Sequence, residues 1–152
     1  MKARQAETQR RFERFERACR GAGAKLTHQR AVIFRELART SDHPDAETIY
    51  RRARKKIPTL SLDTVYRTLW LFNDLGLITT LGPPRARARF DANTSPHHHF
   101  LCTRCGAAQD FYSRQLDDLE VPDEVKAMGD IESVRVEARG LCLRCRERRK
   151  TG

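Results

Sequence analysis

The stretch SLDTVYRTLWLFNDLGLITTL, residues 61–81, combines a helix signal with a strand signal. Ser61 and Thr64 are typical of a helix start. Apolar residues then recur with a helical period at Leu62, Val65, Leu69 and Phe72. Gly76 ends this pattern, and LGLITTL, residues 75–81, alternates as a strand does. We therefore predict a helix with one buried face, followed at once by a strand.

A second strand follows the first after a short turn. The segment GPP, residues 82–84, is a turn signal, and RARARFD, residues 85–91, alternates again. The two runs predict a β-hairpin. Its second strand would place Arg85, Arg87 and Arg89 on one face, where they would either contact phosphates or form a charged sheet edge that protects against aggregation.

Three further helices are predicted upstream of residue 61. The first, over residues 4–19, carries Phe12, Phe15 and Cys19 at helical spacing. The second begins after Thr27, and the third runs from Asp45 to about Lys56. Short helices followed by a hairpin predict a winged helix-turn-helix domain over residues 1–90. In that architecture the last helix enters the major groove of DNA.

The charge is distributed unevenly along the 152 residues. Residues 1–90 hold 20 Lys and Arg against 9 Asp and Glu, a net charge of +11, whereas residues 91–152 hold 10 against 11, a net charge of −1. A basic N-terminal half indicates a polyanionic partner, and double-stranded DNA is the commonest. The alternative is a basic surface that is only solvated.

The polar segment 91–96 predicts a hinge, and residues 97–152 a small α/β domain. Strands are expected at HHFLC, AQDFY and ESVRVEAR, with short helical turns between residues 114 and 128. The tail from Arg144 is polar, and we expect it to fray. The overall prediction is an α+β chain whose C-terminal domain forms a homodimer, in keeping with the symmetry of DNA readers.

Two C-x2-C pairs, Cys102 with Cys105 and Cys142 with Cys145, indicate a structural zinc site. Four thiolates favour tetrahedral Zn²⁺. The competing interpretation, a pair of redox-active motifs, lacks the helix and βαβ pattern that such motifs open. Cys19 lies on the apolar face of the first predicted helix, and we expect it to be a buried core residue.

Three consecutive histidines precede the first cysteine pair. In a strand His97 and His99 point to one face and His98 to the other, so the outer two can chelate one ion. An exposed polar run is the plainer interpretation.

The chain resembles the ferric uptake regulator family over roughly residues 20–147. The shared landmarks are LTHQR at 26–30, HPDAETIY at 43–50, LDTVYRTL at 62–69, GLI at 76–78, RFD at 89–91, and HHHFLCTRCG followed by CLRC. The resemblance implies a dimeric, metal-dependent transcription regulator with a winged-helix domain, a dimerisation domain and a four-cysteine zinc site.

The resemblance also implies a regulatory metal site. Its ligands would be His43, Asp91, His97, His99 and Asp110. Imidazoles and carboxylates suit Fe²⁺ or Mn²⁺. Iron sensors of the family commonly carry glutamate where this chain has Asp91 and Asp110. The two aspartates favour resemblance to the peroxide-sensing branch, PerR, in which bound Fe²⁺ reacts with hydrogen peroxide and a ligand histidine is oxidised. The alternative within the family is an iron-responsive regulator of metal uptake.

Direct contacts with an operator are expected from the exposed face of the helix over 62–74. Tyr66 would contact a thymine methyl group and Arg67 a purine edge, with Arg87 and Arg89 on phosphates. We expect a DNA-binding regulator of transcription that acts as a repressor.

Other classes of protein fit the sequence less well. Two histidines and a carboxylate also occur in non-haem iron enzymes, but a chain this short leaves no domain for an organic substrate. A zinc-stabilised interaction module that never binds DNA is a further alternative. No run of eighteen apolar residues and no secretory signal are present, so we expect a cytoplasmic protein with no membrane partner and no small-molecule substrate.

Overall fold

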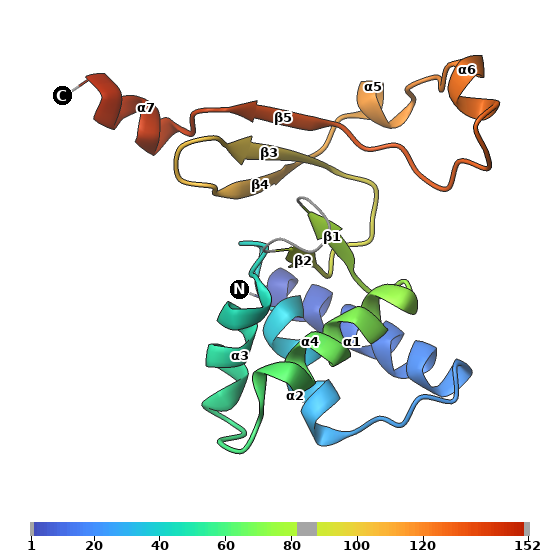
Figure 1. Ribbon diagram of the computed structural model, residues 1–152, viewed down its shortest axis with the longest axis vertical. Helices are drawn as coiled ribbons and strands as arrows, with labels where there is room; N and C mark the ends of the chain where they lie inside the picture. The colour runs from blue at the N-terminus through green and yellow to red at the C-terminus, as the bar shows by residue number, and fades with distance from the viewer. Residues whose placement is uncertain (1, 82–87, 151–152) are drawn as a thin grey trace. The chain divides into compact units, whose positions relative to one another are not determined.

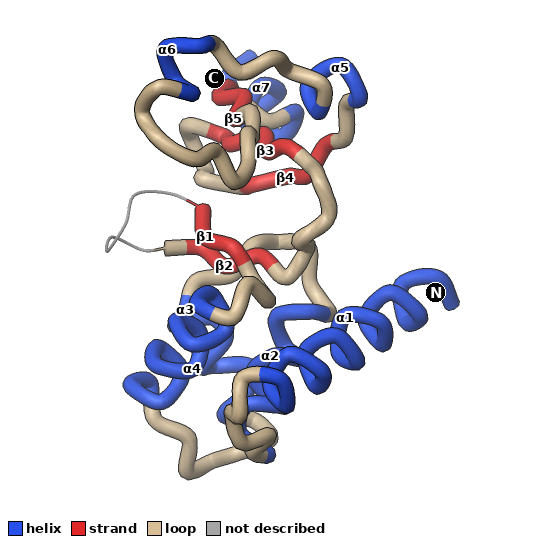
Figure 2. The backbone as a smooth tube through the Cα atoms, turned by 90° about the vertical axis from the view of Figure 1, so that its right-hand side faces the viewer, coloured by secondary structure: helices blue, strands red, loops and turns tan. Residues whose placement is uncertain are grey.

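A computed structural model describes residues 2–81 and 88–150, and the chain divides into two compact units, Met1–Thr94 and Ser95–Gly152 (Figure 1). The division lies within the polar segment 91–96. Helices dominate the first unit, and the second combines a small sheet with short helices (Figure 2). The mixed helix-and-sheet class predicted from the sequence is confirmed.

The N-terminal unit consists of four helices and a hairpin. The helices are α1 (Lys2–Gly21), α2 (His28–Ala38), α3 (Ala46–Arg54) and α4 (Leu62–Asp74), and the strands are β1 (Thr79–Leu81) and β2 (Arg89–Asp91). Thr27, Asp45 and Ser61 cap α2, α3 and α4, because each side chain accepts a hydrogen bond from the backbone N–H three residues later. Helix α3 ends two residues before the predicted end at Lys56.

Four phenylalanines form the centre of the N-terminal core. The rings of Phe15 and Phe34 stack with centroids 4.5 Å apart, and Phe72 meets both edge-on at 5.2 and 5.6 Å. Phe12 packs against Phe15 at 5.4 Å. Cys19 is fully buried in the same cluster, as predicted. The cluster joins α1, α2 and α4, so it fixes the helix that the sequence assigns to DNA.

The hairpin strands pair antiparallel, with Thr79 opposite Asp91 and Leu81 opposite Arg89. The predicted turn at 82–84 and the predicted phosphate ligands Arg85 and Arg87 lie outside the described residues.

The C-terminal unit is built on a three-stranded sheet of order β4-β3-β5. Its elements are β3 (His98–Cys102), β4 (Ala108–Phe111), α5 (Arg114–Asp117), α6 (Asp123–Lys126), β5 (Glu137–Gly140) and α7 (Leu143–Lys150). Strand β3 pairs antiparallel with β4 and parallel with β5. Strand β5 is shorter than the predicted run from Glu132, because β3 offers partners to only four of its residues.

Helix α7 occupies the tail that the sequence analysis expected to fray. The N–H of Arg146 donates to the carbonyl of Cys142 at 2.9 Å, so the second cysteine pair starts the helix. Arginine is also a good helix former. The prediction of a frayed tail is therefore wrong for residues 144–150.

Within the described parts of the chain, no helix is both long and apolar enough to cross a membrane.

Replacement of Phe15 by alanine should lower the free energy of unfolding of the N-terminal unit by about 3–5 kcal/mol, because it opens a cavity beneath two aromatic rings. Trp70, the only tryptophan of the chain, lies on α4 and reports urea unfolding of this unit by fluorescence. Arg17→Ala, at an exposed position of α1, the helix that carries Phe15, should change the free energy of unfolding by less than about 0.5 kcal/mol. Equal effects of the two substitutions would contradict this account of the core.

Candidate metal centres and nucleic-acid face

Four thiols of the C-terminal unit lie close together. Cys102 ends β3 and Cys142 follows β5, and the parallel pairing of these strands brings the two C-x2-C pairs side by side. The Sγ atoms of the four cysteines all lie within 4.8 Å of one another. The Sγ atoms of Cys105 and Cys142 are 3.8 Å apart. A tetrahedron with Zn–S bonds of about 2.3 Å has edges of about 3.8 Å, so the arrangement fits zinc.

The backbone of the first cysteine pair wraps around its sulfurs. Gly106 adopts φ +69°, which favours glycine, and its N–H donates to the carbonyl of Cys102 at 2.8 Å. The N–H of Cys142 reaches Cys102 Sγ at 3.4 Å. This turn points N–H groups at the sulfurs, as a thiolate site requires.

These surroundings act unequally on the four thiols. Hydrogen bonds from the backbone N–H groups of Cys105 and then Cys142 lower the pKa of Cys102 to about 5. The backbone N–H of Ala107 lowers the pKa of Cys105. Burial, with the neighbouring sulfurs, raises the pKa of Cys145 to about 12. Thiols bind metal only after losing their protons, and a divalent cation would offset the free-energy cost of deprotonating the buried thiol of Cys145.

Three nitrogen and oxygen donors gather at the start of β3 in the same unit. His99 lies opposite Asp110 in the β3–β4 register, and its Nε2 is 3.5 Å from Asp110 Oδ1. His97 Nε2 is 3.8 Å from the same oxygen and 2.9 Å from His99 Nε2. The outer two histidines thus share a face, as the alternation predicted.

The tautomer of His97 is set by the backbone. The carbonyl of Ser95 lies 2.6 Å from Nδ1, so Nδ1 carries the proton and Nε2 keeps its lone pair. Two nitrogens bound at about 2.1 Å are about 3.0 Å apart at a right angle and about 3.4 Å apart in a tetrahedron. The 2.9 Å separation from His99 is short enough for both nitrogens to bind one ion, and imidazoles with carboxylates suit Fe²⁺ or Mn²⁺.

The N-terminal unit holds a second pair of donors. His43 Nε2 lies 3.6 Å from Asp91 Oδ2. The loop that carries His43 is fixed to β2, because the N–H of Phe90 donates to the carbonyl of Pro44 at 3.0 Å. His43 has φ 48°, a left-handed conformation that costs a non-glycine residue about 1–2 kcal/mol. Backbone strain of this kind is found at functional sites, where a side chain must hold a defined position.

The sequence analysis did not identify a role for His98. The N–H of Val136 donates to its Nδ1 at 3.2 Å, and its Nε2 is 3.1 Å from Asp117 Oδ1. His98 therefore ties β3 to α5 and to the segment before β5. Strand alternation predicted that it faces away from His97 and His99, but its partners lie too far along the chain for a sequence signal to indicate them.

The exposed face of α4 carries the predicted readers of DNA. The Arg67 side chain is 76% exposed and forms an ion pair with Asp63 at 2.7 Å, and Tyr66 is also exposed. Arg89 of the hairpin is half-buried.

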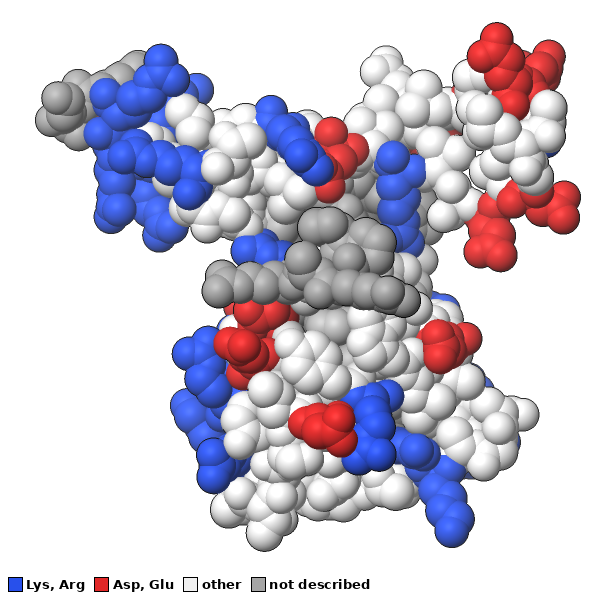
Figure 3. Space-filling model, viewed as in Figure 1, with Lys and Arg blue, Asp and Glu red and all other residues white. Residues whose placement is uncertain are grey.

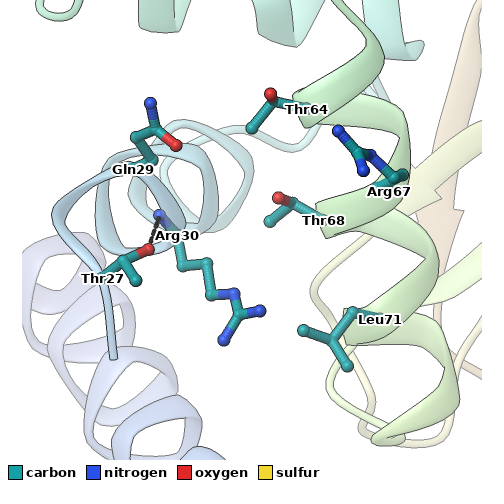
Figure 4. A pocket seen from close by; sticks show the side chains of 7 residues that line it. All are labelled: Thr27, Gln29, Arg30, Thr64, Arg67, Thr68 and Leu71. Atoms are coloured by element: carbon teal, nitrogen blue, oxygen red, sulfur yellow. Dashed lines mark hydrogen bonds between the residues drawn. The ribbon is translucent and has the colours of Figure 1, made fainter. Parts of the chain in front are cut away.

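Beside this face lies a hollow of about 290 Å³ between α2 and α4 (Figure 4). Its lining residues are Thr27, Gln29, Arg30, Thr64, Arg67, Thr68 and Leu71. Arg30 is held there, because its Nη1 donates to the carbonyl of Lys25 at 2.6 Å. Two guanidinium groups and three hydroxyl groups suit a phosphate. The sequence analysis missed Arg30, which is distant from Arg67 in sequence.

A sequence profile of the ferric uptake regulator family matches residues 21–138. The chain belongs to the ferric uptake regulator family. The peroxide-responsive repressor PerR of Staphylococcus epidermidis is 37% identical over 128 residues, which cover 84% of this chain and 85% of that protein. The family predicted from the sequence is confirmed.

Solved structures of family members share the fold. A zinc-bound manganese uptake regulator is 32% identical, with a TM-score of 0.64 over 84% of this chain and 98% of that one. The ferric uptake regulator of Helicobacter pylori is 23% identical, with a TM-score of 0.72 over 91% and 93% of the two chains, a likeness that concerns the fold alone. The predicted α+β fold class, a winged-helix domain followed by a dimerisation domain, is confirmed.

Cys105→Ser should abolish retention of zinc, because three thiolates and a hydroxyl group hold the ion far less tightly. We expect about one zinc per chain in the wild type and less than about 0.2 in the variant after dialysis against a chelator, measured by atomic emission. Cys19→Ala, at a core position, should keep the wild-type zinc content. Full zinc retention by Cys105→Ser would exclude these thiols as the zinc site.

Proposed function

We propose that this family member is a metal-dependent, DNA-binding transcriptional repressor that senses peroxide through an Fe²⁺ or Mn²⁺ site. One observation carries the proposal: imidazole and carboxylate donors are kept apart from a separate cluster of four thiols. The first donor set suits a reactive divalent metal and the second suits inert zinc. The likeness to peroxide-responsive repressors supports this division of roles.

The structural zinc site would use all four clustered thiols: Cys102, Cys105, Cys142 and Cys145. The ion would join the end of β3 to the start of α7 and close a segment of about forty residues. The zinc-bound state of a relative that is 32% identical supports the assignment.

The regulatory metal would take donors from both units. His43 and Asp91 would come from the first, and His97, His99 and Asp110 from the second. Asp91 and His97 are only six positions apart, so a short connecting segment is enough for both side chains to bind one ion. Such an ion would favour one relation of the two units, and a shift from 1:99 to 99:1 requires about 5.5 kcal/mol of differential binding.

Peroxide sensing would end in loss of a ligand. Bound Fe²⁺ supplies the redox chemistry by which hydrogen peroxide transfers one oxygen atom to an imidazole ring and leaves as water. Of the three proposed ligand histidines, His43 and His97 are the proposed targets. An oxidised ring binds metal weakly, so the metal and then the DNA would be released.

The DNA contacts would come from α4 and the hairpin. Tyr66 and Arg67 would read base edges, and Arg87 and Arg89 would contact phosphates. We add Arg30, whose place in the hollow beside Arg67 suits a backbone phosphate. As a regulator bound to chromosomal DNA, the protein would act in the cytoplasm.

The protein would act as a homodimer through its C-terminal unit. Among the described residues this unit leaves large apolar side chains exposed: Tyr112, Leu119, Val125, Met128, Ile131, Val134 and Leu143. A second copy of the chain would cover them.

A second candidate function is regulation of metal uptake in response to iron or manganese. The identity of 32% with a manganese uptake regulator favours it. The named relatives are all regulators, and we propose that this chain likewise has no enzymatic turnover.

Treatment with hydrogen peroxide should release DNA from the iron-loaded protein only. The peptides that contain His43 or His97 should gain about 16 Da, the mass of one oxygen, in the iron form and remain unmodified in the manganese form. DNA binding by fluorescence anisotropy and peptide masses are measured on the same samples.

The peptide that contains His28 provides the internal control, because this histidine is exposed on α2 and belongs to neither donor set. Unmodified His43 and His97 peptides with unchanged DNA binding would instead favour the uptake regulator. Equal oxidation of His28 would show unselective damage.

Arg67→Ala should weaken operator binding by about 1–3 kcal/mol and affect random DNA much less, because the substitution removes a hydrogen-bonding group that reads a base edge. Arg51→Ala, at an exposed position of α3, provides a control of equal charge. An equal loss of affinity for operator and random DNA would identify Arg67 as a phosphate ligand only.

A further inference from the structure

Charge is segregated within the C-terminal unit, although its total is near zero. Residues 110–132 contain eight Asp and Glu against two Lys and Arg, whereas residues 135–150 contain seven Lys and Arg against two Glu. The basic side chains gather where α7 lies and the acidic ones where α5 and α6 lie (Figure 3). Apart from Asp110, neither cluster contributes a donor to the metal centres.

Helix α7 carries exposed arginines on both flanks of the buried Cys145. With about 100° of rotation per residue, four arginines fall within about 100° of Cys145, and Glu147 lies roughly opposite. The four are Arg144, Arg146, Arg148 and Arg149, and all are exposed. Among the residues that the structure describes, no ion pair engages Arg144, Arg146 or Arg149. The surface is therefore a cationic arc.

The arc is held in a fixed place. Cys145 is 5% exposed and anchors the helix in the thiol cluster. Arg104, from the first cysteine pair, donates from Nη1 to the carbonyl of Cys145 at 3.3 Å and adds a further cation beside the helix. Arginines on a helix that is held in place lose less backbone entropy on binding than arginines of a disordered tail.

We propose that the exposed arginines of α7, together with Arg104, form a second contact surface for the phosphate backbone of double-stranded DNA. The inference rests on the proposed DNA-binding function and adds a contact outside the winged-helix unit. An eight-residue helix is about 12 Å long, and that length of duplex carries about seven phosphate charges. One face of a duplex therefore offers phosphates to several arginines of the arc, and the contact would be independent of base sequence.

The test compares three variants of the zinc- and manganese-loaded full chain on a labelled 40-base-pair random-sequence duplex. The first, R144Q/R146Q/R149Q, removes three charges from the arc. The second, R114Q/K126Q/R139Q, removes three charges elsewhere in the same unit. The third, R144K/R146K/R149K, keeps the charge of the arc. Fluorescence anisotropy gives the affinity across a series of salt concentrations, and zinc content is measured for each protein.

We expect the glutamine variant of the arc to flatten the dependence of log affinity on log salt. The slope should change by about 1 for each phosphate that no longer meets an arginine, up to about 3 per chain. The affinity of this variant at about 0.1 M salt should fall at least roughly tenfold. The lysine variant and the control variant should keep the wild-type slope, and all proteins should retain zinc.

Equal slopes for the arc variant and the wild type would overturn the inference, as would an equal change in the control variant, which would reflect net charge alone. Loss of zinc without a change in slope would assign these arginines to the thiolate cluster. Loss of self-association with an unchanged slope would assign them to the acidic region of a second copy. If manganese fails to induce DNA binding by the wild type, the proposed function itself fails. If manganese induces DNA binding but the glutamine variant of the arc keeps the wild-type slope, the inference alone fails.

Discussion

The approach of two cysteine pairs at the ends of β3 and β5 is the interaction on which the C-terminal unit depends. Among its described residues, this unit buries only three apolar side chains, Cys102, Ala108 and Cys145, and two of them belong to the thiol cluster. A segment of fewer than sixty residues with so small an apolar core requires another source of stability. Ligation by four sulfurs provides one, since the binding free energy of a structural metal is also folding free energy.

The N-terminal unit is stabilised in a different way. Its core of stacked phenylalanines and aliphatic side chains is continuous from α1 to β2, and three capped helices start at defined residues. An apolar core of this size can stabilise the unit without a metal, so a metal bound at the proposed ligands His43 and Asp91 would be available for signalling. In the proposed function the two units would divide the tasks, because the first would supply the surface that reads DNA and the second most of the metal ligands.

The sequence predicted those features that depend on short-range chemistry. Capping residues, the apolar stripe of α4 and the C-x2-C spacing each act within a few positions, and the structure has them where they were expected. Features that depend on long-range pairing were missed. The role of His98 depends on Val136, and Arg30 meets Arg67 only through helix packing. Helix α7 was missed because its arginines resemble a solvated tail, whereas the cysteine pair that starts it makes it a helix.

Strand β3 carries donors for two chemistries within five residues. His99, a proposed ligand of the regulatory metal, lies near its start, and Cys102, a proposed zinc ligand, ends it. Because side chains alternate along a strand, insertion or deletion of one residue would turn the imidazoles to the opposite face and displace the sulfur at the same time. Neither ligand set can drift in spacing independently during evolution. The proposed site for an inert metal and the proposed site for a reactive one would thus be inherited together, as a single segment.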